Sequence, residues 1–289
     1  MTNFDSGTYG QFKREVIGVY DRAASLYDHV GTKQGVYYAN RLVERLNIFP
    51  GARVLDVATG RGALLFAVAE KIGTTGYVLG IDLAPNMISE TAAEIKARGL
   101  QQAEVLLMDA DDVSYPNGSF DYILCGFAIH FLNYPRLLAR FCNMLKPGGY
   151  IGTTHPYVPT HNEENFERWK WLFELTREVF PADFQPPTSW VAPNRLNRPE
   201  LIEAALREAG FENISITTEE ATMYFTDEQD WWDWEWSQAS RFWLEGMSPE
   251  GLAKFKAVSF EKLMAMKTPK GIPILIGAML SIANAPASR

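Results

Sequence analysis

The apolar residues of the chain follow two different spacings, which separate predicted helices from predicted strands. In residues 11–48 they recur every three or four positions, which is typical of amphipathic helices. Pro50-Gly51 ends this pattern. From there to residue 154, short β-branched runs alternate with helix-prone stretches. This alternation predicts parallel strands joined by right-handed helical crossovers.

The alternation also predicts where each element begins and ends. Strands are expected at 54–57, 77–81, 103–108, 120–125 and 150–154, with helices at 63–72, 85–98 and 134–145. A helix at 199–209 and two final strands at 213–225 and 272–284 complete the pattern. The fold class is therefore α/β and Rossmann-like, with a seven-stranded, mostly parallel sheet preceded by N-terminal helices.

Two stretches do not fit the alternation and are predicted to be insertions. Residues 156–198 and 227–268 are rich in tryptophan, and the first follows strand 150–154 directly. Open α/β sheets bind ligands at the carboxyl ends of their strands. We therefore expect both insertions to form a helical lid over that edge. The predicted domains are an N-terminal helical cap, a core and this lid: cap 1–50; core 51–155, 199–226 and 269–289; lid 156–198 and 227–268.

Composition and charge exclude several classes of protein. The 289 residues are 47% hydrophobic, so the chain can bury a full core. A net charge of -8 disfavours a nucleic-acid partner, and two cysteines are too few for a disulfide framework. The longest apolar stretch, 272–285, is shorter than the roughly 20 residues of a membrane span. The first ten residues lack the apolar segment of a signal peptide, so we expect a cytoplasmic protein.

The strongest chemical signal is the segment VLDVATGRG at 54–62, a strand followed by a turn with two glycines. Glycines admit unusual backbone dihedrals and the close approach of a ligand, although an ordinary turn explains such a pair equally well. Asp82 and Asp109 end the next two predicted strands. With Asp56, they place three carboxylates at one edge of the sheet. This indicates a bound ligand, because charges are seldom placed there without a partner.

Two kinds of cofactor fit such an edge. The dinucleotide fingerprint has a third glycine where this chain has Leu65, and a bulky residue there is expected to obstruct a pyrophosphate. Asp56 also suits a cationic amino group better than a dianionic pyrophosphate. The turn therefore favours S-adenosylmethionine (SAM) over NAD. A dinucleotide-dependent oxidoreductase and a non-catalytic SAM-binding module stay as alternatives.

Further motifs extend the signal over roughly residues 16–155 and 199–225. They are VYDRAASLYD (19–28), VLDVATGRG (54–62), GIDLAPNM (80–87), MDA (108–110), SFDYI (119–123), LKPGG (145–149) and LREAGF (206–211). Together they resemble the class I SAM-dependent methyltransferases of the small-molecule type. That type includes the ubiquinone/menaquinone-biosynthesis C-methyltransferases and related natural-product tailoring enzymes.

The resemblance implies which residues contact SAM. The glycine turn would line the methionine part, Asp82 would hold the ribose, and Leu83 and Met87 would pack on the adenine. Asp109 would read the adenine amine, Cys125 would pass under the sulfonium, and N-terminal tyrosines would fold over the cofactor. The implied set is Tyr20, Tyr27, Asp56, Ala58, Gly60, Gly62, Asp82, Leu83, Met87, Asp109, Ala110, Cys125 and Gly126.

Methyl transfer from a sulfonium is an in-line displacement, so the protein mainly positions the reactants and excludes water. A general base is needed only where the acceptor must lose a proton early, as a hydroxyl does. The catalytic candidates are His155, His130 and Tyr20, each of which also has a purely structural interpretation. Metal-ligand spacing is absent from the sequence, so no metal is expected. The segment after strand 120–125 lacks the Asn/Asp-Pro-Pro-Tyr motif, which argues against DNA and glutamine-amide methylation.

The tryptophans at 231–243 leave three interpretations open: packing of the insertion, an apolar substrate pocket, or an oligomer contact. An aromatic lid predicts a small apolar or aromatic acceptor, such as a quinol, polyketide, indole alkaloid or isoprenoid. Carbon, oxygen and nitrogen acceptors are all compatible with the motifs. A homo-oligomer is possible.

Overall fold

The computed structural model of the chain describes residues 6–157, 162–180 and 196–288. The chain divides into two compact units. The first unit consists of Met1–Lys33, Val158–Asn194 and Glu220–Gly277. The second unit consists of Gln34–Tyr157, Arg195–Glu219 and Ala278–Arg289.

A seven-stranded mixed sheet has the strand order β3-β2-β1-β4-β5-β7-β6. Its strands are β1 (Arg53–Val57), β2 (Tyr77–Asp82), β3 (Ala103–Leu107), β4 (Phe120–Gly126), β5 (Leu145–Tyr157), β6 (Glu212–Phe225) and β7 (Ile272–Asn284). β1 pairs in parallel with β2 and β4, β2 with β3, and β4 with β5. The predicted α/β fold with a seven-stranded, mostly parallel sheet is confirmed.

The fifth strand begins earlier than the sequence pattern indicates. The segment 146–149, which contains Pro147 and two glycines, predicts a stop before the strand, yet β5 already starts at Leu145. Leu145 pairs with Phe120, and the register shifts before Tyr122 pairs with Tyr150. A bulge of this kind accommodates extra residues in one strand without ending the pairing.

Helices α3 (Ala63–Ile72) and α4 (Pro85–Arg98) begin and end where the sequence predicts. Gly62 precedes α3 with φ of 80°, and Gly99 ends α4 with φ of 67°. Both angles lie in the left-handed region that glycine adopts without steric cost. Pro85 occupies the first turn of α4, where a backbone N–H would have no helical partner.

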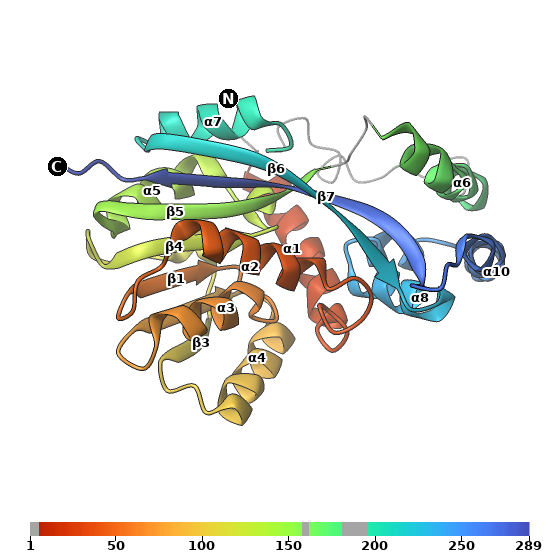
Figure 1. Ribbon diagram of the computed structural model, residues 1–289, viewed down its shortest axis with the longest axis horizontal. Coiled ribbons are helices and arrows are strands. Elements are labelled where there is room, and N and C mark those ends of the chain that lie inside the picture. The colour runs from red at the N-terminus through yellow and green to blue at the C-terminus, as the bar shows by residue number, and fades with distance from the viewer. Residues whose placement is uncertain (1–5, 158–161, 181–195, 289) are drawn as a thin grey trace. The chain divides into compact units, whose positions relative to one another are not determined.

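Helices cover both faces of the sheet in the second unit (Figure 1). α2 (Gln34–Leu46) packs on α3 on one face, and α5 (Tyr134–Met144) packs on α7 (Pro199–Glu208) on the other. The buried apolar cluster that joins the sheet to α5 and α7 includes Leu55, Ile81, Ile123, Leu138, Phe141 and Leu206.

The sequence predicts an N-terminal cap of residues 1–50, which would hold both α1 and α2. In the structure, the second unit begins at Gln34 and therefore includes α2. Leu42 and Val43 of α2 are 0% and 2% exposed, and the helix contacts both α3 and β5. Its apolar face therefore belongs to the core of the second unit. The functional roles of cap and lid stay predictions.

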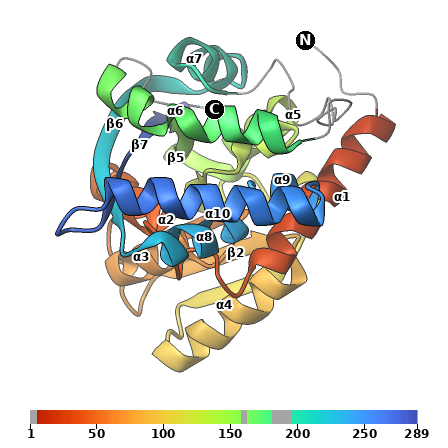
Figure 2. The same ribbon diagram turned by 90° about the vertical axis from the view of Figure 1, so that its right-hand side faces the viewer.

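The first unit is mostly helical and contains most of both insertions, together with the end of β6 and the start of β7. Its helices are α1 (Ser6–Ala23), α6 (Glu163–Val179), α8 (Glu228–Ser237), α9 (Arg241–Glu245) and α10 (Pro249–Met266). α6 and α10 lie side by side (Figure 2). Trp231 and Trp232 of α8 are 0% and 8% exposed and pack with Phe255 and Leu263. For these two tryptophans, the packing interpretation is the one that the structure supports. Among the described residues, no helix combines the length and hydropathy of a membrane span.

Candidate functional site

The turn after β1 has an unusual backbone. Ala58, Gly60 and Gly62 have φ angles of 54°, 53° and 80°. The Thr59 N–H donates to the Ile81 carbonyl at 2.9 Å, which ties the turn to β2. A non-glycine residue in the left-handed region costs on the order of 1–2 kcal/mol, so Ala58 is held there by its surroundings.

Asp56 lies beneath this turn and is 1% exposed. Its Oδ2 accepts the Thr59 hydroxyl at 2.6 Å, while its Oδ1 has no hydrogen-bond partner among the described residues. Burial raises the pKa of Asp56 to about 7, although the Thr59 hydrogen bond partly offsets the shift. A buried carboxyl of this kind is compatible with the predicted binding of a cationic group, and that role stays a prediction.

Asp82 connects the turn to the next helix. Its Oδ2 accepts the Gly60 N–H at 2.9 Å, and its Oδ1 accepts the Ala84 N–H at 2.9 Å. Each carboxylate oxygen has about two acceptor positions, so a carboxylate can accept more than these two bonds. This capacity matches the predicted role of Asp82 in holding a ribose.

The predicted adenine side is ordered by a short 3-10 helix, η1 (Ala110–Asp112). Asp109 caps it by accepting the Asp111 N–H at 2.9 Å, and Ala110 is 8% exposed. Met87 is buried on α4 at 1% exposure, and Leu83 is partly buried. The structure therefore places apolar residues and one capping carboxylate at the ends of β2 and β3.

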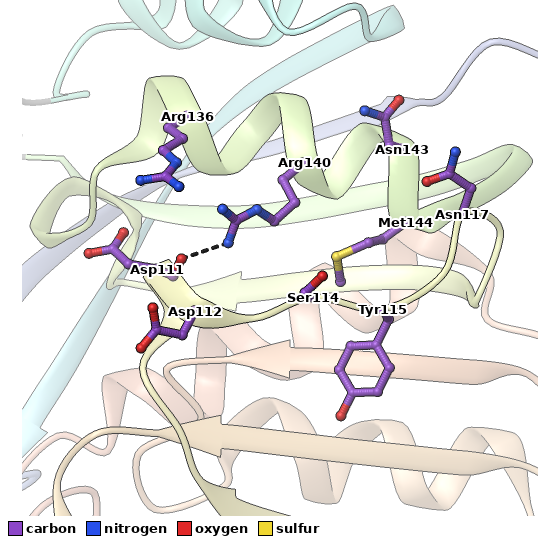
Figure 3. A pocket seen from close by; sticks show the side chains of 9 residues that line it. All are labelled: Asp111, Asp112, Ser114, Tyr115, Asn117, Arg136, Arg140, Asn143 and Met144. Atoms are coloured by element: carbon purple, nitrogen blue, oxygen red, sulfur yellow. Dashed lines mark hydrogen bonds between the residues drawn. The ribbon is translucent and has the colours of Figure 1, made fainter.

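A cavity of about 350 Å³ lies between η1 and α5 (Figure 3). Arg140 crosses it and donates to the carbonyls of Asp111 at 2.6 Å and Val113 at 2.9 Å. None of the lining residues belongs to the predicted cofactor set. Arg140 instead fixes the segment that follows Ala110.

The segment at the end of β4 is tightly packed. Cys125 is 1% exposed, and burial raises the pKa of its thiol above the usual range, so the thiol stays neutral. A Cβ on Gly126 would lie 3.0 Å from Leu64 Cδ1. Phe127 follows with φ of 50°, and its N–H donates to both the carbonyl and the hydroxyl of Thr154 at 3.0 Å. Sequence reasoning missed this anchor, since no motif marks Thr154.

His155 is predicted to face the ligand edge, and it is buried, at 1% exposure. Its Nε2 lies 2.6 Å from the Thr153 hydroxyl, which in turn lies 2.5 Å from the Ser281 hydroxyl. Burial lowers the pKa of His155 to about 4, so the ring is neutral at pH 7. This surrounding favours a structural polar chain between β5 and β7, and a catalytic role for His155 stays a prediction.

The other catalytic candidates lie in different parts of the chain. His130 is partly buried on η2 (Ile129–Phe131), with its ring centroid 4.1 Å from that of Phe131. Tyr20 and Tyr27 belong to the first unit, and their rings pack edge to face at 5.6 Å. Their roles toward cofactor and acceptor stay predictions.

The structure corrects the argument from Leu65. Its side chain is 0% exposed, and a Cβ on Gly80 would lie 2.8 Å from Leu65 Cδ1. Leu65 therefore faces strand β2 and does not obstruct a ligand above the turn. Gly80 provides the space that a third glycine provides in a dinucleotide fold, where helix and strand approach closely. The preference for SAM over NAD consequently rests on Asp56 and on the comparisons below.

Two residues of the turn's surroundings were not found from the sequence. Thr91 of α4 is 0% exposed and donates its hydroxyl to the Gly60 carbonyl at 2.9 Å. The Arg61 side chain is 6% exposed and lies 3.5 Å from Glu94 and 3.7 Å from Glu90. No sequence motif marked either residue, because a lone threonine or arginine more often faces solvent. Within the described residues, no group of three His, Cys, Asp or Glu side chains has metal-binding geometry.

Comparisons with known proteins identify the family of the chain and its fold. A family model described as "Methyltransferase domain" matches residues 54–149. The chain is 33% identical over 258 residues to the nocamycin O-methyltransferase of Saccharothrix syringae, covering 86% of this chain and 90% of that protein. It is 26% identical over 213 residues to the demethylmenaquinone methyltransferase of Bacillus pumilus, covering 70% of this chain and 91% of that protein. The crystal structure of a putative methyltransferase from Bacillus halodurans superposes with a TM-score of 0.55 at 19% identity, covering 86% and 98%, which shows a shared fold.

Proposed function

The chain belongs to the SAM-dependent methyltransferases, and on that premise we propose that it methylates an oxygen atom of a small, apolar, oxygen-bearing acceptor. The observation that carries the proposal is the extent of the match to an O-methyltransferase. A match over 258 residues cannot be confined to the second unit, so it includes much of the first unit as well. The parts of the chain outside the matched methyltransferase domain are therefore also shared with that relative.

The glycine turn and its carboxylates fit SAM chemically. Asp56 would bind the amino group of the methionine part through its unpaired Oδ1. Asp82 would accept the ribose hydroxyls, and Asp109 with Ala110 would read the adenine edge. Bound SAM supplies a methyl group on a positively charged sulfur. We assign to this chain the work of binding, orienting and excluding water around that group.

Two of the residues in the proposed site are not strong bases. His155 is neutral and weakly basic, with a pKa of about 4, and Cys125 is a neutral thiol. An acceptor hydroxyl that ionises by itself near neutral pH, such as an enol or an electron-poor phenol, needs no protein base. Such acceptors fit this site best. The acceptor hydroxyl would first lose its proton to water. The resulting oxygen anion would then bond to the methyl carbon of SAM, and S-adenosylhomocysteine would leave.

We propose that residues 156–198 and 227–268 select the acceptor. Trp169 and Trp171 of α6 are stacked with centroids 6.1 Å apart, and neither indole N–H has a hydrogen-bond partner among the described residues. Buried donors usually have an acceptor. A flat acceptor with carbonyl or phenolate oxygens would provide both the apolar surface and the missing acceptor atoms.

The test begins with cofactor and acceptor screening of the full chain. Calorimetric titration with SAM, S-adenosylhomocysteine and NAD should show binding of the first two; binding of NAD with indifference to SAM would overturn the assignment. Incubation with 13C-methyl SAM and a panel of naphthoquinols, hydroxyanthraquinones and cyclic β-diketones should yield an O-methyl carbon signal by NMR. A C-methyl product, or turnover of polar metabolites alone, would contradict the proposed acceptor chemistry.

A variant of the first unit sharpens this test. Trp171→Phe keeps an aromatic ring but removes the indole N–H together with the fused pyrrole ring, so it should raise KM for the acceptor found in the screen with little change in kcat. Trp243→Phe, also in the first unit, serves as the matched control. An equal KM in Trp171→Phe and the parent protein would remove this indole from acceptor recognition. The cytoplasmic location and the possible homo-oligomer stay predictions.

A further inference from the structure

Both peptide groups of Gly60 are held by the βα unit that follows the turn. The Gly60 N–H donates to Asp82 at the end of β2, and the Gly60 carbonyl accepts the hydroxyl of Thr91 on α4, each at 2.9 Å. Thr91 is 0% exposed, although the two residues before it on α4, Ser89 and Glu90, are exposed. The buried Thr91 hydroxyl therefore has a specific partner in the turn.

The two residues that follow Gly60 also contact α4. A Cβ on Gly62 would lie 3.0 Å from the Thr91 methyl group, so this methyl packs directly against the turn. Between them, the Arg61 guanidinium lies 3.5 Å from Glu94, one helical turn beyond Thr91. Residues 60–62 thus contact a single helix through a hydrogen bond, an ion pair and a packed methyl.

We propose that Thr91 is a positioning residue that holds the glycine turn in its cofactor-binding shape. The inference rests on the proposed role of this turn in binding SAM. Gly60 and Gly62 both have left-handed φ angles, and glycine samples many other conformations when it is not held. A turn that is ordered in advance does not lose that freedom on binding, so the ligand binds more tightly.

The experiment is calorimetric titration of the full chain with S-adenosylhomocysteine. Thr91→Val keeps the methyl packing, removes the hydroxyl and leaves the part-buried Gly60 carbonyl without this partner, so the Kd should rise about tenfold. Thr91→Ser restores the hydroxyl and should bind within about twofold of the parent protein. Ser89→Ala, on the exposed face of α4, should be unchanged.

Two further variants separate a positioning role from lost stability and from a wrong site. Leu206→Ala lies in the core on α7, at 2% exposure, and should lower the thermal midpoint at least as far as Thr91→Val without changing the Kd. Asp82→Ala should abolish or strongly weaken binding if the turn is the cofactor site. Weak binding by Asp82→Ala with parental binding by Thr91→Val would overturn this inference alone, whereas parental binding by Asp82→Ala would overturn the proposed site.

Hydrogen exchange provides a second readout if Thr91→Val is too unstable for titration. At low temperature, amide exchange of the peptide spanning residues 58–64 should be slow in Thr91→Ser, which keeps the hydroxyl. It should be fast in Thr91→Ala, which lacks it. Leu206→Ala should leave that peptide as protected as in the parent protein. Equal protection in Thr91→Ala and Leu206→Ala would contradict the proposal.

Discussion

The glycine turn of the second unit and the tryptophan-rich helix α8 of the first unit each bury a carboxyl, but in different surroundings. Asp56 is 1% exposed and keeps one oxygen unpaired beneath a turn of left-handed residues. Glu235 is 8% exposed in a helix that also carries four tryptophans. Burial raises the pKa of both to about 7. The same desolvation thus acts on Asp56, which is proposed to bind a cationic ligand, and on Glu235 in the tryptophan-rich helix.

The comparison suggests that binding of the cofactor and stability of the first unit can be separated. The second unit holds its polar groups through backbone hydrogen bonds at the strand ends. The first unit is held by aromatic contacts such as those of Trp231 with Trp232 and Phe255, at centroid distances of 6.3 and 6.2 Å. Substitutions in the two regions should therefore affect different measurements.

Trp231→Ala should have the largest effect on stability. Removal of a fully buried tryptophan costs about 3–5 kcal/mol of unfolding free energy, because the cavity cannot collapse completely. Urea unfolding followed by circular dichroism measures the loss. Below the transition, the Kd for S-adenosylhomocysteine should stay within about threefold of the parent value. A much larger loss of affinity would show that the two regions are not separable.

Asp82→Ala should have the opposite pattern. Its carboxylate accepts two backbone N–H groups and is proposed to hold the ribose, so its loss should cost on the order of 1.5–3 kcal/mol in S-adenosylhomocysteine binding. Titration calorimetry measures this loss directly. Asp112→Ala, on η1 and outside the predicted cofactor set, is a suitable control that should bind normally. Parental affinity in Asp82→Ala would contradict the assignment.

The pH dependence of the unfolding free energy should report both buried carboxyls. Each has a folded pKa near 7, above its unfolded value, so the folded state holds more protons between about pH 4 and 7. The unfolding free energy should therefore fall as the pH rises through this window. Asp56→Asn and Glu235→Gln should each remove part of the fall, on the order of 1–3 kcal/mol.

Saturating S-adenosylhomocysteine tests which carboxyl meets the ligand. Its amino group should favour the charged form of Asp56 and reduce the Asp56 part of the pH dependence. The Glu235 part should persist. Unfolding measured at pH 5 and pH 8, with and without ligand, gives the four values needed. If the ligand reduces the pH dependence of stability equally in Asp56→Asn and in the parent protein, Asp56 does not bind the amino group.

Ala58→Gly should have the smallest effect. Ala58 has φ of 54°, a conformation that glycine adopts without the steric cost that alanine incurs. We expect a gain of about 0–1 kcal/mol in unfolding free energy, since glycine also loses more entropy on folding. The thermal midpoint measures it. A marked loss of stability would show that the alanine methyl is needed for packing in the turn.

The order of elements was predictable from the sequence by itself. β1, α3, β2 and α4 follow local spacings of two and 3.6 residues, and α3 and α4 have the predicted bounds. The glycine turn and the carboxylates of Asp56 and Asp82 were also recognisable, because they recur at strand ends. These features depend on residues that are close in sequence, and local propensity and alternation are enough to indicate them.

The tertiary structure decided the features that depend on distant residues. Thr91 reaches the Gly60 carbonyl across 31 positions, and Thr153 reaches Ser281 across 128. His155 is buried, which its sequence position does not indicate, and Leu65 packs toward Gly80 rather than toward a ligand. No local pattern contains these pairings, because a buried hydroxyl or imidazole is specified only by the strand or helix that folding brings next to it.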